Sequence, residues 1–469
     1  MLDNVLRPVA TITPARRLAE FASGLFFEDI PKPVLDRAKL LILDAVGCAL
    51  ASNAYDFSNV VIAGVTALGG EGTCSVIGRD VRLPVRDAAL ANGMLIHGLD
   101  FDDTHLNSII HATAACLPCA LSFGEVRGID GRMLLAAYAC GMETAIRIGA
   151  AVKGGFHHAG FHATGLVAHF SSAVVAARML GLTADGIVAA QGIAASTASG
   201  VQVFLEEGAW TKRMHPGWAA VAGITAALLA QKGFKAPTRP YEGRFGFFDT
   251  HIQHPPTPID LGAELNSLGE IWELAETAIK PYPVCHFIHG CADAAIELHA
   301  QIDPVDIAHV EALLPRDTMP IVAEPTAAKV RPTNEYEAKF SAQFVVATCL
   351  IKGVFGLADL MPAALADPVV LDLTRRVACA IDPDTAFPAY FSGGVRVTLK
   401  DGRGLFRHIR VNSGAGERAL DEDAVSKKFL ASAALTIPLA QAERIRETVL
   451  ELERHTATEI AALLRSPAT

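Results

Sequence analysis

Apolar residues recur at spacings of three and four through the first half of the chain. Residues 33–52, 85–99, 131–151 and 182–198 all show this helical period, and short Gly or Pro breaks separate them. Alanine and glycine are frequent, as in AAYACGMETAIRIGA, so neighbouring helices can approach closely. Several segments are apolar around their whole circumference, which is typical of buried helices. We therefore predict a helical bundle with fully buried inner helices.

The pattern changes after about residue 268. Residues 309–314 read as a strand, and residues 394–411 alternate apolar and polar side chains around Asp401-Gly402, which predicts a hairpin. Helical stretches at 291–298 and 341–351 lie between them. The sequence thus indicates an α+β domain.

Helical spacing returns from residue 421, and we expect this last segment to pack back on the first domain as a charged, partly exposed helix. The predicted fold class is mainly α with an α+β second domain. We assign residues 1–270 and 413–469 to a large all-helical domain and residues 271–412 to the smaller α+β domain.

The composition of the chain indicates which kinds of binding partner to expect. Hydrophobic residues make up 51% of the chain and charged residues 19%, which favours a large core and an oligomer interface. A net charge of -10 argues against nucleic acid and anionic membranes as partners. Two uncharged stretches, 156–177 and 186–205, are interrupted by polar residues and read as helices buried within protein.

Cysteine usage and the N-terminus indicate the cytoplasm. Nine cysteines, an odd number, make no disulfide framework and suit a reducing compartment. Residues 1–17 have no continuous apolar run after their basic residues and do not read as a secretory signal. The single CxxC at Cys116 and Cys119 has no second half, so buried thiols explain it better than zinc.

Several common motifs are missing from the sequence. It contains no GxxxxGK[ST], no GxGxxG after a strand, no GxSxG and no HExxH. Nucleotide hydrolases and zinc hydrolases of those types are therefore disfavoured.

The most informative segment is NGMLIHGLDFDDTH, which begins at Asn92, together with His111. Three carboxylates and three imidazoles fall within the fifteen residues 97–111, flanked by Ala-rich sequence in which an unpartnered ion is costly. A solvated acidic loop would explain Asp102 and Asp103 equally well. For Asp100 and His111 we favour function.

Two further segments bring polar side chains next to apolar helices. GFHHAGFHATG holds His157, His158 and His162 before an apolar helix whose N-terminus offers free N–H groups to an anion, and we favour function for His162 alone. EEGAWTKRMHPG places Lys212 and His215 between apolar helices. A run of surface charges is the alternative, but we favour contacts of these two side chains with a bound anion.

A third segment, KPYPVCHFIHGC, starts at Lys280. Its two prolines hold the backbone extended, which would aim Lys280 into a cleft between the domains. A zinc site from Cys285, His289 and Cys291 is the alternative, but no four-ligand set is evident and we predict no metal. The EYEAKFS stretch from Glu335 reads as a charged helical turn.

Together, these groups suit proton transfer on an anionic substrate. Lysines bind carboxylates, and histidine takes or returns a proton near neutral pH.

The motifs NGMLIHGLDFDDTH, GFHATG, EGAWTKRMHPG, KPYPVCHFIH and EAKFSAQF resemble the MmgE/PrpD family in sequence and order over nearly the whole chain. That family includes 2-methylcitrate dehydratase, cis-aconitate decarboxylase and iminodisuccinate epimerase. The resemblance implies a helical domain, a smaller α+β lid, an active site between them, homodimers and no required cofactor. The residues that fall on the active-site positions of the decarboxylase branch are Asp100, Thr104, His111, His162, Lys212 and Lys280.

The chain also departs from that branch. Cys285 stands where the branch has a histidine, Phe344 replaces a tyrosine, and the spacer from Thr104 to His111 is one residue longer. Ala112 and Ala163 stand where prolines are common. These differences count against decarboxylation of cis-aconitate.

We therefore expect an enzyme that removes a proton next to a carboxylate of a small di- or tricarboxylate, as a hydro-lyase of the 2-methylcitrate dehydratase kind. An epimerase of the iminodisuccinate kind, a decarboxylase and a catalytically silent binding protein remain alternatives. The expected catalytic residues are His111, His162, Asp100, Lys212 and Lys280. The expected substrate contacts are Thr104, His105, His215, Cys285, His286, His289 and Phe344.

Overall fold

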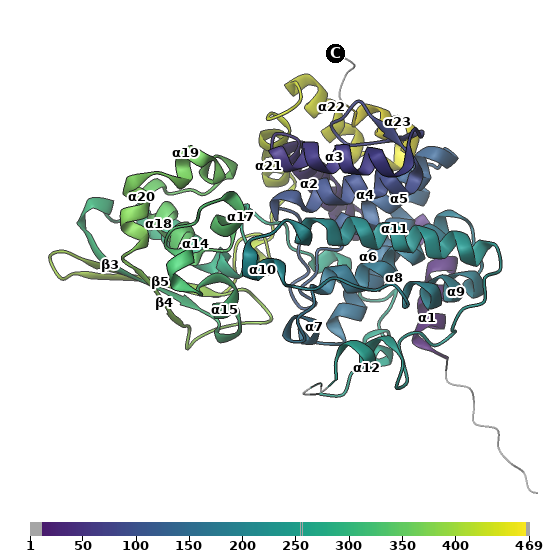
Figure 1. Cartoon of the computed structure of the whole chain (residues 1–469), viewed down its shortest axis with the longest axis horizontal. Coiled ribbons are helices and arrows are strands. Elements are labelled where there is room, and N and C mark those ends of the chain that lie inside the picture. Colours follow the sequence, from purple (N-terminus) through teal and green to yellow (C-terminus); the bar gives the residue numbers. More distant parts are fainter. Residues whose placement is uncertain (1–11, 254, 256, 466–469) are drawn as a thin grey trace, which may run out of the picture.

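A computed structural model describes residues 12–253, 255 and 257–465 of the chain. We expect no secretory signal in residues 1–17, and residues 1–11 of this segment lie outside the described residues. Figure 1 shows a large helical body beside a smaller body that contains a sheet. This confirms the predicted fold class, a helical domain with a smaller α+β domain.

The helical domain is built from two separate parts of the chain. Its N-terminal helices are α1 (Pro14–Gly24), α2 (Lys32–Ser52), α3 (Asp56–Gly69), α4 (Val85–Ile96), α5 (Thr113–Arg127), α6 (Gly131–Ala150), α7 (Gly155–His158), α8 (Ala163–Met179), α9 (Ala184–Ala194), α10 (Phe204–Glu207), α11 (Thr211–Gln231), α12 (Phe247–His251) and α13 (Leu261–Glu264). A short hairpin, β1 (Cys74–Ser75) with β2 (Arg82–Leu83), lies between α3 and α4.

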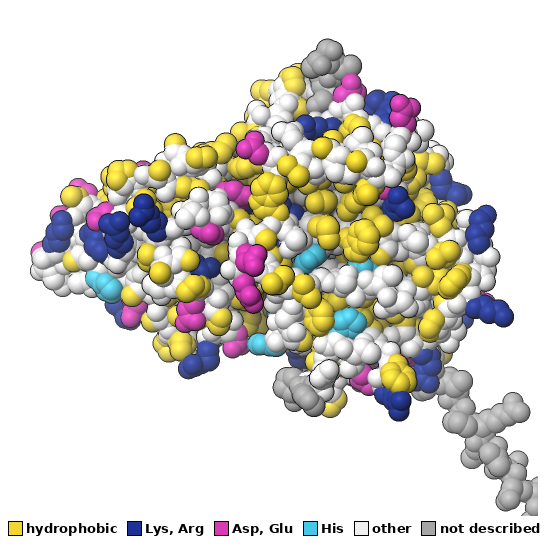
Figure 2. Space-filling model, in the orientation of Figure 1, with side chains coloured by type: hydrophobic (Ala, Val, Ile, Leu, Met, Phe, Trp, Pro, Cys, Tyr) yellow, Lys and Arg dark blue, Asp and Glu magenta, His cyan; other side chains and the backbone are white. Residues whose placement is uncertain are grey.

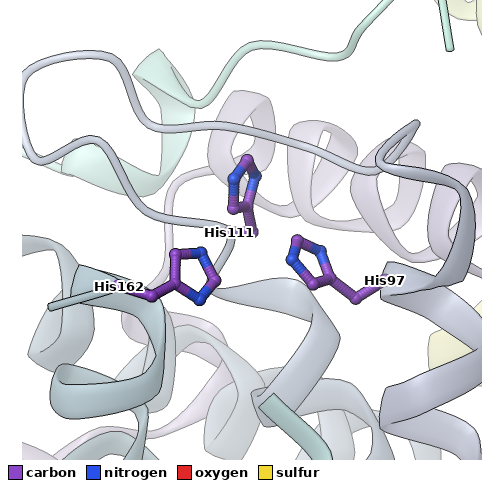
Figure 3. Close-up of side chains that lie close together, drawn as sticks. All are labelled: His97, His111 and His162. Carbon is purple, nitrogen blue, oxygen red and sulfur yellow. The ribbon is translucent and has the colours of Figure 1, made fainter. Parts of the chain in front are cut away.

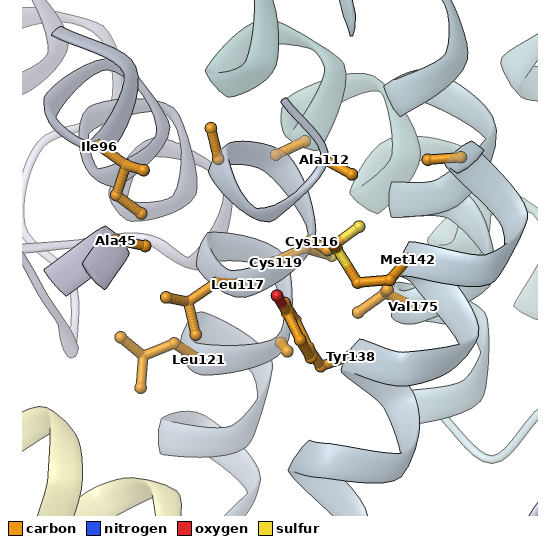
Figure 4. Close-up of a cluster of buried hydrophobic side chains, with 14 of the residues drawn as sticks. Ala45, Ile96, Ala112, Cys116, Leu117, Cys119, Leu121, Tyr138, Met142 and Val175 are labelled. Atoms are coloured by element: carbon orange, nitrogen blue, oxygen red, sulfur yellow. The ribbon is translucent and has the colours of Figure 1, made fainter. Parts of the chain in front are cut away.

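The inner helices of this domain are buried on all sides, as the apolar pattern predicts. Every residue of α8 is buried, and α8 packs against α5, α6, α9 and α11. Figure 4 shows Cys116 of α5 near Met142 of α6 and Val175 of α8. Small residues permit the closest crossings: a Cβ on Gly93 of α4 would lie 2.6 Å from the Cα of Gly217 in α11. This contact fixes α11 beside the end of α4, where the polar cluster starts.

The C-terminal segment returns to the helical domain, as expected, but as three helices rather than one. These are α21 (Glu422–Ala433), α22 (Leu439–Leu450) and α23 (Ala457–Leu463). Pro438 stands at the N-cap of α22, and Thr456 caps α23 with a side-chain hydrogen bond, so each break has a local cause. Both α21 and α22 pack against α2, and α23 packs against α5.

The α+β domain holds a four-stranded sheet covered by helices. Its strands are β3 (Ile307–Leu314), β4 (Val377–Ile381), β5 (Gly393–Leu399) and β6 (Gly404–Ile409), in the order β4-β3-β5-β6. Its helices are α14 (His289–His299), α15 (Met319–Val322), α16 (Thr326–Lys329), α17 (Glu335–Lys339), α18 (Ala342–Lys352), α19 (Pro362–Leu365) and α20 (Pro368–Thr374). The predicted β5–β6 hairpin forms around Asp401 and Gly402. Gly402 has a φ of 88°, a conformation that suits glycine.

Strand β4 was not predicted. It pairs in parallel with β3 at the sheet edge, and its five residues show no clean alternation between buried and exposed positions. A short edge strand of this kind leaves little periodic signal in the sequence.

Two large hydrophobic cores divide the described chain. One draws on residues up to Ile279 and again from Val425, and the other on Ala278 to Ala415 together with Leu106, Ile109 and Phe204 from the helical part. These last three side chains tie the two bodies together beside the polar cluster. No helix in the described ranges has the length and apolar character needed to cross a membrane.

Candidate active site

The site is organised by the loop that comes after α4. The helix ends at Ile96, a single 3-10 turn (His97–Leu99) comes next, and Asp100 adopts a left-handed conformation with a φ of 53°. Aspartate tolerates this conformation better than most residues. Thr104 then exchanges two backbone hydrogen bonds of 2.9 Å with Ala278. This bridge brings the segment that carries Lys280 next to Asp100.

Asp100 accepts hydrogen bonds from two lysines that come from distant parts of the chain. The Nζ atoms of Lys212, near the start of α11, and of Lys280 lie 2.8 and 2.9 Å from Asp100 Oδ1. Lys280 also donates to the Asp100 carbonyl at 2.8 Å. Burial alone would raise the pKa of Asp100, but the two ammonium groups outweigh it and hold that pKa well below its usual value. The trio therefore carries a net positive charge, which suits a carboxylate ligand.

Three imidazoles lie beside Asp100, and Figure 3 shows these rings close together. The ring centres of His97 and His111 are 4.8 Å apart, those of His97 and His162 5.6 Å, and those of His111 and His162 6.0 Å. His162 is the N-cap residue of α8, and the backbone N–H of His111 donates to Thr164 Oγ1 in the same helix. The N-terminus of α8 thus holds two of the three residues in place.

The hydrogen bonds of His111 set its tautomer. Its Nδ1 lies 2.6 Å from the carbonyl oxygen of Asp103, which can only accept, so Nδ1 carries the proton and Nε2 keeps a lone pair. His162 pairs through Nδ1 with His215 Nδ1 at 3.0 Å. Burial, reinforced by nearby cations and imidazoles, lowers the pKa of both His111 and His162 well below 6.5. Both rings are therefore neutral at pH 7 and able to accept a proton.

The two remaining aspartates of the loop differ in charge. Asp102 accepts from His97 Nδ1 at 2.8 Å, and although burial opposes ionisation, His97 lowers the Asp102 pKa to about 2. Asp103 is buried and the Thr113 hydroxyl donates to its side chain, and burial together with Asp102 raises its pKa to about 8. Asp102 is thus a carboxylate and Asp103 a carboxylic acid at neutral pH. Neither is the solvated acid of the alternative interpretation, because both are buried.

Asp100, its two lysines, His111 and His162 line one cavity at the junction of the two bodies. Its empty space is about 490 Å³, including the part open to solvent, and apolar side chains make up much of its wall. The polar lining residues are Asp100, Thr104, His111, His157, His162, Gln202, Lys212, Lys280, Cys285 and His286. The apolar lining residues are Ile109, Phe204, Leu205, Phe287, Ile321, Phe340 and Phe391. An apolar wall strengthens every charge interaction inside it.

Comparison with known proteins shows the family of this chain. The sequence model of the MmgE/PrpD N-terminal domain matches residues 16–259, and that of the MmgE/PrpD C-terminal domain matches residues 282–454. The chain belongs to the MmgE/PrpD family.

Individual MmgE/PrpD relatives are distant but of similar length. The chain is 26% identical to a cis-aconitate decarboxylase of Aspergillus terreus, over 95% of this chain and 94% of that protein. It is 26% identical to the Homo sapiens cis-aconitate decarboxylase, over 95% and 93% of the two chains. It is 25% identical to a 2-methylcitrate dehydratase of Cupriavidus necator, over 93% and 91%.

The structure brings most of the predicted site residues of this MmgE/PrpD protein together. All five expected catalytic residues line the cavity, and so do three of the expected substrate contacts, Thr104, Cys285 and His286. Their roles in catalysis and binding stay predictions.

Four expected substrate contacts lie behind the cavity wall. His105 binds Ser108 Oγ at 2.5 Å, and His215 supports His162 from the side. His289 Nε2 lies 3.3 Å from the Val284 carbonyl, and Phe344 packs on Phe355 in the core of the α+β domain. At these positions the four side chains would act on a ligand only through their neighbours.

Sequence reasoning assigned no role to several residues of the site. His97 and Asp102 stand out in hindsight by their five-residue spacing across the turn after α4, and they form a buried ion pair or hydrogen bond. Gln202 and Phe204 line the cavity from the segment before α10 and from α10 itself, and no motif marks them. Among the described residues, the groups spaced to hold a metal are His97 with His111 and His162, and His97 with Asp100, Asp102 and His111; neither includes a cysteine.

Proposed function

We propose that this protein is a cofactor-independent lyase that removes a proton next to a carboxylate of a small di- or tricarboxylate, most simply a dehydratase. The observation that carries the proposal is Asp100 bound by two buried lysines, within one apolar cavity that also holds two neutral imidazoles. The relatives named as lyases, a dehydratase and decarboxylases, support the same class.

The substrate carboxylates would be held by Lys212 and Lys280. Both ammonium groups keep donors free, because each has three hydrogens and the contacts to Asp100 use only part of them. Asp100 fixes their positions before the substrate binds, so little ordering is left for the binding step. A charge-assisted hydrogen bond from each lysine then orients the carbon that loses its proton.

His111 is the group best placed to take that proton. Its Nε2 lone pair is available because Nδ1 is bound to a backbone carbonyl. The lysines stabilise the negative charge that develops on the carboxylate as the C–H bond breaks. The departing β-hydroxyl would take the proton that His111 has accepted and leave as water, beside His162, which His215 holds in place. Each positioned acid or base contributes roughly 10²- to 10⁴-fold in rate.

Dehydration and epimerisation share this first step and differ in the second. Loss of a β-hydroxyl gives the lyase, and return of the proton to the opposite face gives an epimerase. Decarboxylation is less well supported, because Cys285 and Phe344 replace the histidine and tyrosine of the branch that this sequence resembles. Burial raises the pKa of the Cys285 thiol to about 11, so it offers no charge at that place.

Incubation in deuterated water tests the proposal directly. A panel of citrate-like, aconitate-like and aspartate-derived acids is mixed with the chelator-treated enzyme, and exchange is followed by NMR. We expect deuterium at one carbon of one acid, and the product then distinguishes elimination from inversion. No exchange with any acid, together with no carboxylate that raises the melting temperature, would favour a silent family member instead.

We further propose that the chain is a homodimer that joins through α11. Its outer face exposes Met214, Trp218, Leu228 and Leu229, and residues 214–231 contain no Asp, Glu, Lys or Arg. Figure 2 shows hydrophobic side chains across this part of the surface. An uncharged apolar face of this length is typical of a self-association surface. A cytoplasmic location remains our proposal, and nine free thiols support it.

A further inference from the structure

The imidazoles of His97, His111 and His162 form a cluster with an unusual shared property. Each of the three rings has its Nδ1 engaged: by Asp102 in His97, by the Asp103 carbonyl in His111, and by His215 in His162. No hydrogen bond reaches the Nε2 atom of any of them within the described part of the chain, and the Nε2 atoms of His97 and His162 are completely buried. The Nε2 atoms of the three rings are thus left without a hydrogen-bond partner among the described residues.

The tautomers are set by these contacts. The carboxylate of Asp102 and the carbonyl of Asp103 only accept, so His97 and His111 carry their protons on Nδ1. For His162 the alternative tautomer would leave a buried N–H at Nε2 without an acceptor, which is unfavourable. Its proton is therefore on Nδ1, donated to His215, and its Nε2 also keeps a lone pair.

We propose that these three histidines bind a single divalent transition-metal ion, with Zn²⁺ as the best fit, and that the ion inhibits the enzyme. A ring nitrogen of each histidine lies within 4.8 Å of the others, and Asp100 lies within the same distance of His97 and His111. The set matches the three-imidazole sites that zinc prefers, with a carboxylate or water as the fourth ligand. The Asp102 contact to His97 is the carboxylate–histidine arrangement that orients metal ligands.

The size and charge of the site are compatible with this ion. Zinc–nitrogen bonds of about 2.0–2.1 Å place three ligand nitrogens roughly 3.3 Å apart, so nitrogens that lie within 4.8 Å of one another have to move toward the ion by up to about 0.9 Å each. Side-chain rotation supplies such a shift. The carboxylates of Asp100 and Asp102 balance the ammonium groups of Lys212 and Lys280, so the approaching ion meets no large net repulsion.

Inhibition would result because the metal and the substrate proton compete for one nitrogen of His111. The Nε2 lone pair of His111 that would accept the substrate proton is the one that would bind the metal. Zinc at this place also occupies the space between His111 and His162 where the reacting carbon would lie. The binding itself rests on the side chains alone, whereas its inhibitory effect rests on the proposed function.

Cobalt substitution tests the binding without any substrate. Chelator-treated protein is titrated with Co²⁺, and the intense visible absorption of four-coordinate cobalt should grow to one equivalent and disappear when Zn²⁺ is added. His97→Gln should abolish this spectrum, and Asp102→Asn should weaken Zn²⁺ binding about 10- to 100-fold. His169→Gln is the matched control, because His169 is another buried histidine with Nδ1 on a backbone carbonyl but lies outside the cluster.

Several outcomes would overturn the proposal. Folded wild-type protein that gives no four-coordinate cobalt spectrum would do so whether or not the variants fold. An unchanged spectrum in folded His97→Gln protein would place the metal elsewhere. If the deuterium exchange occurs but cobalt does not bind, only the metal site is wrong. If cobalt binds but no acid exchanges, the metal site stands, whereas the proposed function and the inhibitory role that rests on it are wrong. Exchange that Zn²⁺ accelerates would refute the inhibitory role.

Discussion

The Asp100→Asn substitution examines the centre of the site, where one carboxylate holds two buried lysines. Asparagine has nearly the same shape, so the change removes charge with little change in packing. Asp100 Oδ1 lies 2.8 Å from Lys212 Nζ and 2.9 Å from Lys280 Nζ. At an effective dielectric constant of ~20, each contact corresponds to about 6 kcal/mol of Coulomb attraction, most of which offsets the cost of burying the ions.

Removing one partner of a buried ion pair typically destabilises a protein by about 3–5 kcal/mol, because the remaining charge stays buried. In this variant Lys280, which is fully buried, keeps the backbone carbonyl of residue 100 and the asparagine oxygen as acceptors but loses the negative charge beside it. We therefore expect a lower midpoint of urea unfolding, which corresponds to a loss of about 3–5 kcal/mol in the free energy of unfolding. We also expect a non-reacting tricarboxylate to stabilise the variant more than the wild type, since the ligand supplies the missing negative charge.

The matched control is Glu143→Gln. Glu143 is a buried carboxylate bound to Arg147 Nε at 3.0 Å, but it does not line the cavity. Its substitution should also lower stability, yet tricarboxylate should then stabilise it no more than the wild type. This account of the trio would be refuted if the Asp100→Asn protein were as stable as the wild type. It would also be refuted if tricarboxylate stabilised the Glu143→Gln protein as much as the Asp100→Asn protein.

Three other measurements examine the base, the buried acid and the dimer surface. His111→Gln should lower the rate of deuterium exchange about 10²- to 10⁴-fold with little change in substrate affinity, and a rate near the wild-type value would exclude His111 as the base. Folding takes up a proton at Asp103 between about pH 4 and 8, because its folded pKa of about 8 exceeds the unfolded value, so the contribution of Asp103 to stability should fall as pH rises through that window. Asp103→Asn should remove that fall, by up to about 1.4 kcal/mol per pH unit in urea unfolding, and parallel curves for the two proteins would contradict the buried acid. Met214→Lys with Trp218→Glu should convert the dimer to a monomer in light scattering, whereas Phe406→Glu, an exposed aromatic of the α+β domain, should not; a monomeric wild type would end the dimer proposal.

The sequence by itself determined the local structure and the types of residue in the site. The three-and-four spacing predicted α2, α4 and α6 nearly to their ends, and the Asp401-Gly402 turn predicted the β5–β6 hairpin. These features depend on neighbours along the chain, which is why a pattern can reveal them. The motifs also carried the resemblance to the family, and with it several of the polar residues that line the cavity.

Only the tertiary structure decided how those residues meet. Lys212 and Lys280 lie 112 and 180 positions from Asp100, so no periodicity could place both on one carboxylate oxygen. The charge of each group was equally out of reach: Asp102 and Asp103 are adjacent in sequence, yet one is paired with His97 and ionised while the other is buried beside Thr113 and protonated. Ionisation depends on burial and on partners in space, and both are properties of the packed chain.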